Sequence, residues 1–178
     1  MIETERLTLR PFVEADRADW MAMVTDPEVA EPLGGARIQA PDYFDGVLTF
    51  WATYGHGPLA LLRRSDGALI GRVGIRRQPP EWAHPMMGEV EVGWMLARPA
   101  WGEGYATEAA RAALAWGFET LGVPQIFSWT TQVNVRSQAV MRRLGMRRVA
   151  ERDFLQPGRD ADDPLGPHVV FVIGRDHQ

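Results

Sequence analysis

Residues 101–109 read WGEGYATEA and join a strand pattern to the longest helix pattern of the chain. The start of a helix leaves its first four backbone N–H groups unpaired and carries partial positive charge. Glycines just before a helix let the backbone bend sharply, and they have no Cβ to keep an anion away. We therefore predict a turn in which the N–H groups of residues 102–106 converge on a pyrophosphate, with a merely tight connection as the alternative.

Two familiar phosphate-binding motifs do not fit this turn. A dinucleotide-binding GxGxxG motif would have its third glycine where Thr107 stands, and it would end the following strand with an acidic residue. A P-loop would continue with Gly-Lys-Ser/Thr, which the chain lacks here. The helix after the turn has small residues on one face, which allows close packing on a sheet: Ala106, Ala109, Ala110, Ala113 and Gly117.

The remaining sequence alternates between strand and helix patterns. Strands are expected at 6–10, 58–63, 69–76, 89–96, 126–131, 146–153 and 169–173, and helices at 14–24, 42–54, 104–121 and 134–144. Residues 32–41 and 156–168 are expected to be loops, and Ser65-Asp66-Gly67 is a hairpin turn. Two strand–helix–strand units in the second half predict an α/β fold, a mixed sheet of about seven strands with about four helices on its faces.

Composition limits the other possibilities. The 178 residues suit one domain, 1–178, and the absence of cysteine excludes disulfides and thiolate metal sites. The net charge of −4 and the lack of a long basic run argue against non-specific nucleic-acid binding. The charged start and the lack of an apolar run of roughly 20 residues suggest neither a signal peptide nor a membrane partner, so we expect a cytoplasmic protein. The four histidines are not spaced as metal pairs, and no metal site is predicted.

Three segments occur in an order that resembles the GNAT superfamily of N-acetyltransferases: the strand 91–96, the turn 101–109, and Asn134-Val135-Arg136-Ser137 followed by Leu144-Gly145-Met146. The opening ERLTLRP, residues 5–11, is similar to the RimJ/RimL-like branch, which acetylates the N-termini of ribosomal proteins. The resemblance covers nearly the whole chain. It implies a GNAT-like acyl-CoA N-acyltransferase fold, acetyl-CoA as a co-substrate, and a primary amine as the acceptor, with a protein N-terminus as one option.

The resemblance also implies roles for individual residues. The family pattern Gln/Arg-x-x-Gly-x-Gly/Ala binds the coenzyme A pyrophosphate through backbone amides; Gly104 and Ala106 fit it, whereas Trp101 replaces Gln or Arg. The strand before the turn pairs with the pantetheine arm, and Asn134 contacts that arm. The donor-binding residues so implied are Trp94, Met95, Leu96, Trp101, Gly102, Glu103, Gly104, Tyr105, Ala106 and Asn134.

Acetyl transfer to an amine requires a base for the amine and a proton for the departing thiolate. Glu89 and Glu91 are two apart in a strand, so they point to one face, opposite Val90, Val92 and Trp94. Glu91 matches the family better and is the first candidate for the base, with a simply solvated acidic face as the alternative. Ser137 is the candidate acid, because it shares a helical face with apolar residues; bonding to its own helix backbone is equally compatible.

Several assignments stay open on sequence alone. Trp51, Tyr54, Trp82 and His84 could wall the acceptor pocket, and the acidic cluster Asp160, Asp162 and Asp163 could attract a cationic acceptor. Arg142, Arg143, Arg147 and Arg148 form a basic stripe that suits either nucleic acid or the 3′-phosphate of coenzyme A. A non-catalytic domain that only binds acyl-CoA is the alternative function. The acceptor is not identified, and either a monomer or a homodimer is compatible with the sequence.

Overall fold

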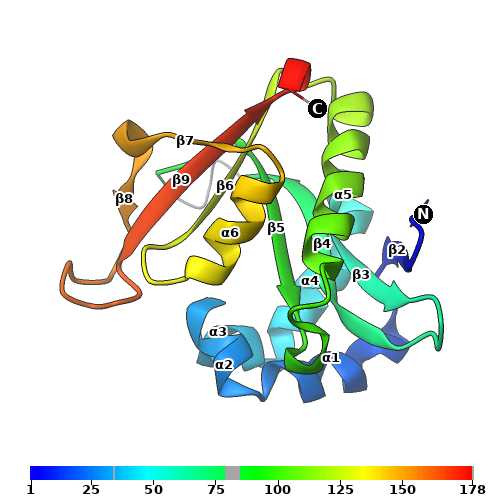
Figure 1. The fold of residues 1–178 in the computed structure, drawn as a ribbon. Coiled ribbons are helices and arrows are strands. Elements are labelled where there is room, and N and C mark those ends of the chain that lie inside the picture. Colours follow the sequence, from blue (N-terminus) through cyan, green and yellow to red (C-terminus); the bar gives the residue numbers. More distant parts are fainter. Residues whose placement is uncertain (34, 79–84, 178) are drawn as a thin grey trace. The chain divides into compact units, whose positions relative to one another are not determined.

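The computed structural model describes residues 1–33, 35–78 and 85–177, which divide into two compact units (Figure 1). Unit 1 comprises Met1–Ile75 and Gly93–Ala113, and unit 2 comprises Arg76–Val92 and Leu114–Gln178. Three elements contribute residues to both units: β4 (Leu69–Arg77), β5 (Val90–Leu96) and α5 (Tyr105–Leu121).

Unit 1 contains an antiparallel run of strands. β1 (Ile2–Glu3) pairs with β2 (Leu7–Pro11), β2 pairs with β3 (Gly57–Arg63), and β3 pairs with β4. The β3–β4 hairpin turns as predicted, because Gly67 has a φ of 74°, which a glycine adopts without strain. The first residues after β5 lie along β4, where the N–H of Ala97 donates to the Ile70 carbonyl over 2.9 Å.

The helices of unit 1 enclose an aromatic core. They are α1 (Arg17–Val24), α2 (Pro27–Ala30), α3 (Ala36–Gln39) and α4 (Pro41–Tyr54). Phe12 meets Trp20 edge-on at 5.6 Å between ring centroids, and Phe44 is fully buried beside them. The predicted helix 14–24 begins as a 3-10 turn, Glu14–Asp16, and then continues as α1.

The prediction of a loop at 32–41 is wrong. Part of this stretch forms the 3-10 turn Glu31–Leu33 and the short helix α3. Ile38 is only 2% exposed within the core, and the side chain of Gln39 donates to the Val24 carbonyl over 2.8 Å. These contacts with residues distant in sequence stabilise a helical turn that local propensity does not predict.

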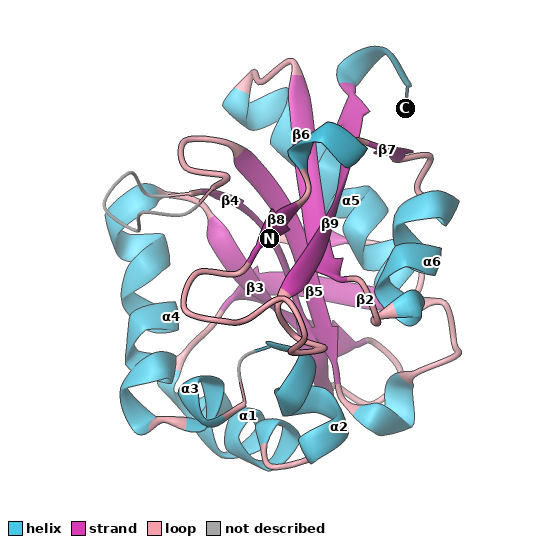
Figure 2. Ribbon diagram, turned by 90° about the vertical axis from the view of Figure 1, so that its left-hand side faces the viewer, coloured by secondary structure: helices cyan, strands magenta, loops and turns pink. Residues whose placement is uncertain are grey.

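Unit 2 combines parallel and antiparallel pairing (Figure 2). β5 lies parallel to β6 (Gln125–Thr131), with Glu91 opposite Phe127, and β6 lies antiparallel to β9 (Pro167–Gly174). β7 (Arg147–Arg148) and β8 (Phe154–Leu155) also pair with β9, and α6 spans Val135–Arg143. The core of the unit gathers apolar side chains from several of these segments: Met86, Phe127, Val149, Val170 and Val172.

The predicted strand 146–153 is largely wrong. Only Arg147 and Arg148 are strand, and the 3-10 turn Ala150–Arg152 follows. The carboxylate of Asp153 accepts the backbone N–H of Val170 over 3.1 Å, so a side chain ends the ladder where a backbone carbonyl would have continued it.

The mixed α/β class is confirmed. Unit 1 is antiparallel, whereas unit 2 also contains the parallel pair that a strand–helix–strand unit requires. The described strands number nine rather than about seven, because the two-residue strands β1 and β8 were not predicted. In the described part of the chain, no helix combines the length and apolar character needed to cross a membrane.

Candidate active site

The turn at 101–106 has the backbone that the sequence predicts. β5 ends at Leu96, a 3-10 turn covers Arg98–Ala100, and α5 begins at Tyr105. Gly102 and Gly104 have φ values of 84° and 81°, a region that side chains with a Cβ rarely adopt. Both glycines are exposed, and no hydrogen bond among the described residues engages the N–H groups of residues 102–106. These amides are therefore available to an anion, and binding of a pyrophosphate stays a prediction.

Trp101 anchors the beginning of this turn. Its indole N–H donates to the Leu96 carbonyl over 2.8 Å, and its backbone N–H donates to the Arg98 carbonyl over 3.1 Å. Its side chain packs against the core of unit 1. The residue that replaces the family's Gln or Arg thus fixes where the turn leaves β5, and its contact with the donor stays a prediction.

The end of β5 presents mainly backbone. Met95 and Leu96 are 4% and 6% exposed, so their side chains belong to the interior. Trp94 is half-buried. Any contact of Met95 and Leu96 with a pantetheine arm would accordingly use their N–H and C=O groups, as the resemblance implies.

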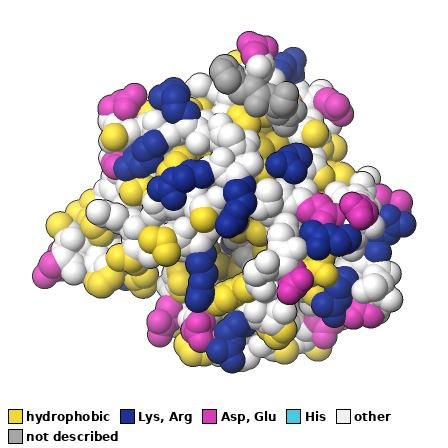
Figure 3. Space-filling model, in the orientation of Figure 1, with side chains coloured by type: hydrophobic (Ala, Val, Ile, Leu, Met, Phe, Trp, Pro, Cys, Tyr) yellow, Lys and Arg dark blue, Asp and Glu magenta, His cyan; other side chains and the backbone are white. Residues whose placement is uncertain are grey.

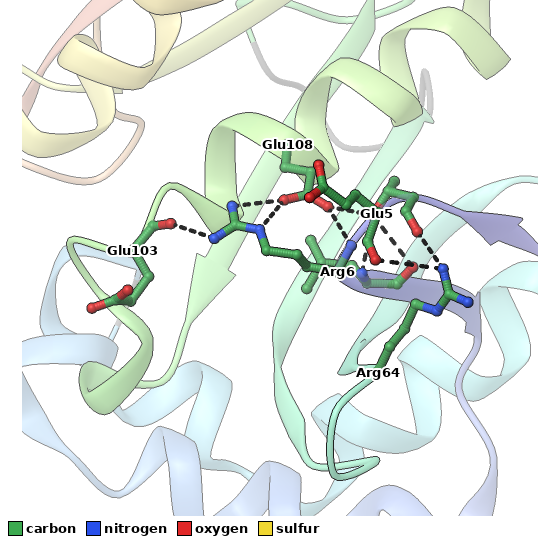
Figure 4. Close-up of polar contacts among 7 residues, drawn as sticks. Glu5, Arg6, Arg64, Glu103 and Glu108 are labelled. Carbon is green, nitrogen blue, oxygen red and sulfur yellow. Dashed lines mark hydrogen bonds and ion pairs between the residues drawn. The ribbon is translucent and has the colours of Figure 1, made fainter.

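A polar network lies beside the turn (Figure 4). Arg6 Nε donates to Glu108 Oε2 over 2.7 Å, and Arg6 Nη1 donates to the Glu103 carbonyl over 3.0 Å. Thr4 Oγ1 donates to Glu108 Oε1 over 2.6 Å. Burial alone would raise the pKa of Glu108, but hydrogen bonds from Thr4 and Arg6 outweigh it and lower that pKa. No sequence pattern indicated this network, since Arg6 and Glu108 are 102 positions apart.

In unit 2, Glu91 is held by two donors. Its Oε2 accepts Arg76 Nη2 over 2.8 Å and Gln78 Nε2 over 2.5 Å, and its side chain is 14% exposed. Val90 and Val92, on the opposite side of β5, are buried as predicted, whereas Trp94 is half-buried and Glu89 lies just before the strand. Glu91 is therefore an ion-paired carboxylate on a strand rather than part of a solvated acidic face.

Glu89 is paired as well. Its Oε1 accepts Arg152 Nη2 over 3.0 Å, and its side chain is 28% exposed. The same guanidinium lies 5.2 Å from the ring centroid of Phe127. Pairing alone thus does not separate the two candidate bases, although Glu91 is the more enclosed.

Asn134 caps α6 as predicted. Its Oδ1 accepts the backbone N–H of Ser137 over 3.1 Å. Its side-chain amide N–H groups donate to none of the described residues. Ser137 is half-buried on the face that carries Val140 and Met141, and its hydroxyl makes no hydrogen bond within the described chain. A hydrogen bond from this hydroxyl to its own helix backbone is therefore not observed. The role of Ser137 as an acid stays a prediction.

His168, on β9, is one of the four histidines whose spacing predicted no metal site. Its ring stacks on Phe154 at 5.0 Å, and Nδ1 lies 3.0 Å from the Gly166 carbonyl. Because a carbonyl only accepts, Nδ1 carries the proton and Nε2 is left as an acceptor. Burial lowers the pKa of His168, and Arg159 lowers it further, against the Gly166 carbonyl and Glu91, which raise it. The unprotonated Nε2 makes His168 a further candidate base.

Of the four residues proposed to wall an acceptor pocket, the structure describes two, Trp51 and Tyr54. Trp82 and His84 lie outside the described residues. Trp51 donates its indole N–H to the Pro58 carbonyl over 2.7 Å, and Tyr54 is 46% exposed.

In the acidic cluster of Asp160, Asp162 and Asp163, Asp163 is paired with Arg159 at 2.6 Å. Among the described residues, no three His, Cys, Asp or Glu side chains gather as a metal site would require.

The predicted basic stripe is partly neutralised. Arg148 forms an ion pair with Asp153, and Arg142 donates to the Gln138 side chain over 3.3 Å. Figure 3 shows basic and acidic side chains on the same face, with hydrophobic ones between them. Of the two contacts, only the pair of Arg148 with Asp153 compensates a charge, so both interpretations of the stripe stay open.

A family model for the acetyltransferase (GNAT) domain matches residues 6–147. The chain is 29% identical over 154 residues to the FsC-acetyl coenzyme A-N(2)-transacetylase of Aspergillus fumigatus, which covers 83% of this chain but only 65% of that protein. It is 30% identical over 146 residues to the uncharacterized protein YkkB of Bacillus subtilis, covering 80% of this chain and 83% of YkkB. The crystal structure of the acetyltransferase from Agrobacterium tumefaciens str. C58 has a TM-score of 0.74 and 32% identity, covering 98% of this chain and 94% of that one.

The chain therefore belongs to the GNAT family of N-acetyltransferases, as the resemblance predicted. The family uses acetyl-CoA as its acyl donor, and the described residues 101–106 supply a backbone suited to its pyrophosphate.

Proposed function

We propose that this chain transfers an acetyl group from acetyl-CoA to a primary amine by direct attack in a ternary complex. The observation that carries the proposal is the exposed turn before α5, where Gly102 and Gly104 adopt positive φ and the amides of residues 102–106 are unengaged. In a GNAT domain, such amides are suited to the pyrophosphate of the donor.

The chemistry needs few protein groups. Bound acetyl-CoA supplies the thioester carbonyl carbon that the amine attacks. As the N–C bond forms and the C–S bond breaks, the amine loses a proton and the sulfur gains one. Glu91 is the first candidate to accept the amine proton, with Glu89 and the imidazole of His168 as alternatives. The unbonded hydroxyl of Ser137 is the candidate donor to the sulfur.

For the acceptor, we propose an α-amine at a protein N-terminus. The support is the RimJ/RimL-like opening segment, residues 5–11, and the lower pKa of an α-amine, about 7.7–8.0 against about 10.4 for lysine, which eases deprotonation. A small-molecule amine is the alternative, and the Aspergillus relative is itself named as an N(2)-transacetylase.

A thiol-release assay with acetyl-CoA tests the proposal. The acceptors are peptides with free α-amines, the same peptides with blocked N-termini, polyamines, amino acids and aminoglycosides, and mass spectrometry identifies the acetylated product. We expect release with free α-amine peptides and none with blocked ones. Release with polyamines only would overturn the acceptor but not the activity. Calorimetric binding of acetyl-CoA without release for any acceptor would favour the non-catalytic alternative.

A further inference from the structure

Residues 4–6, which connect β1 to β2, are tied to the start of α5 by Arg6. Its guanidinium reaches Glu108 through two nitrogens, Nε and Nη2, each at 2.7 Å from Oε2. Its backbone N–H also donates to Glu108 Oε1 over 2.9 Å, and its guanidinium carbon lies 4.5 Å from the ring centroid of Tyr105. Figure 4 shows Arg6 between Glu103 and Glu108, with Arg64 on the other side of residues 4–6. All of these residues belong to unit 1.

The bond from Arg6 to the Glu103 carbonyl fixes one peptide plane of the turn. The peptide between Glu103 and Gly104 is trans, so its C=O and N–H point in opposite directions. Because the carbonyl is held by Arg6 Nη1 at 3.0 Å, the N–H of Gly104 points away from Arg6. Arg6 thereby aims one of the unengaged amides of the turn outward, where an anion can meet it.

Arg6 also decides the charge beside the turn. Glu108 lies in the first turn of α5, the end of the helix that attracts anions. An unpaired carboxylate there would repel a pyrophosphate at the same end. Arg6 neutralises this carboxylate, while Thr4 and the Arg6 backbone satisfy its other oxygen.

We propose that Arg6 is a positioning residue for the donor: it orients the Glu103–Gly104 peptide and cancels the charge of Glu108, so that the turn accepts a pyrophosphate. This inference rests on the proposed function, because it assumes that the turn binds acetyl-CoA. The ligand chemistry is a pyrophosphate ester, and the part of the donor beyond the pyrophosphate is not recognised by Arg6.

Calorimetric titration with acetyl-CoA tests this role in the full chain. We expect Arg6→Ala to raise the Kd by about 10- to 100-fold, the range typical for losing hydrogen bonds to charged groups. Arg6→Lys keeps the positive charge but lacks the planar guanidinium, so we expect it to raise the Kd less than Arg6→Ala does. The double variant Arg6→Ala/Glu108→Gln should bind more tightly than Arg6→Ala, because the uncompensated carboxylate is gone. If Arg6 and Glu108 only clamp the structure, the double variant should instead bind acetyl-CoA no more tightly than Arg6→Ala, because it has lost both partners of the clamp.

Arg64→Ala is the matched control. The side chain of Arg64 donates to the Thr4 carbonyl over 2.7 Å, in the same connection between β1 and β2, but it bonds neither Glu103 nor Glu108. We expect its Kd to be that of the wild type. A second readout is kcat/KM with acetyl-pantetheine, which lacks the pyrophosphate and should be unaffected in Arg6→Ala.

Three results would overturn the role of Arg6: wild-type affinity in Arg6→Ala, an equal loss in Arg64→Ala, or a double variant no better than Arg6→Ala. A wild-type chain that binds no acetyl-CoA would instead refute the proposed function, and Arg6 would lose its role with it.

Discussion

Glu91 and Glu89 differ in their partners more than in their exposure. Glu91 Oε2 is shared by Arg76 and Gln78, which leaves Oε1 to meet a substrate. Glu89 Oε1 is bound by Arg152, whose guanidinium also lies over the Phe127 ring. Both carboxylates are ion-paired, so pairing alone does not rank them. The two donors on Glu91 hold it in one orientation, as catalysis requires, and together with its better match to the family they make Glu91 the first candidate.

We therefore predict different results for two isosteric substitutions. Glu91→Gln should lower kcat by about 10²–10⁴-fold, the usual contribution of general acid–base catalysis, with unchanged affinity for acetyl-CoA. Glu89→Gln should lower stability slightly through the weakened ion pair and leave kcat near that of the wild type. Steady-state kinetics on an identified acceptor checks both. If only Glu89→Gln loses turnover, the roles are exchanged. If neither does, His168 or deprotonation in solution takes the place of the carboxylate.

At the scale of elements, α6 shows how one side chain can combine two functions. The Oδ1 of Asn134 caps the helix by accepting the Ser137 N–H, while its amide N–H groups remain unbonded within the described chain. A cap needs only the oxygen, whereas a contact with a pantetheine carbonyl would need the N–H. These two requirements can be separated by substitution.

We predict that Asn134→Ala lowers the free energy of unfolding by about 0.5–2 kcal/mol, because the cap is lost. Asn134→Asp keeps an oxygen in place and should retain most of that stability. Both variants lose the amide N–H, so both should bind acetyl-CoA more weakly than the wild type. Denaturant unfolding and calorimetry measure the two effects. Wild-type affinity in Asn134→Asp would show that Asn134 is a cap and nothing more.

Elements determined by local pattern were predictable from the sequence. The β3–β4 hairpin with its Asp-Gly turn, the long helices α4 and α5, and the cap of α6 all follow from residues near one another in the chain. The short helix α3 was not predictable, because it depends on the burial of Ile38 and on a bond from Gln39 to Val24. The truncated strand β7 was missed for the same reason, since Asp153 ends it from its side chain.

In the candidate site, too, local features were predictable from the sequence and long-range partners were not. The glycines of the turn and the buried side of β5, with Val90 and Val92, were readable from spacing alone. The partners that hold the turn and the two glutamates were not. Arg6 meets Glu108 across 102 positions, and Arg152 meets Glu89 across 63, and no periodicity links such distant pairs.

At the scale of the whole molecule, a bound donor should stabilise the native chain, because a ligand that binds only the folded state shifts the unfolding equilibrium by mass action. With acetyl-CoA at about 100 times its Kd, the stabilisation is about 2.7 kcal/mol. For a chain of 178 residues, each kcal/mol raises Tm by about 2–4 °C. We therefore predict a rise in Tm of about 5–10 °C, measured by differential scanning calorimetry or fluorimetry.

A pair of glycine variants makes this prediction specific to the turn. Gly104 has a φ of 81° and Gly122, at the other end of α5, has a φ of 64°, so a valine at either position introduces comparable backbone strain. A Cβ at Gly104 would meet only Arg6 Nη2, at 3.6 Å, and a Cβ at Gly122 would meet nothing within 4 Å. Both variants should therefore fold with a lowered Tm. Only Gly104→Val should lose the rise caused by acetyl-CoA, because the branched side chain disfavours the positive φ of the turn and crowds Arg6, whereas Gly122 lies outside the turn. An equal rise in both variants would place the donor elsewhere on the chain.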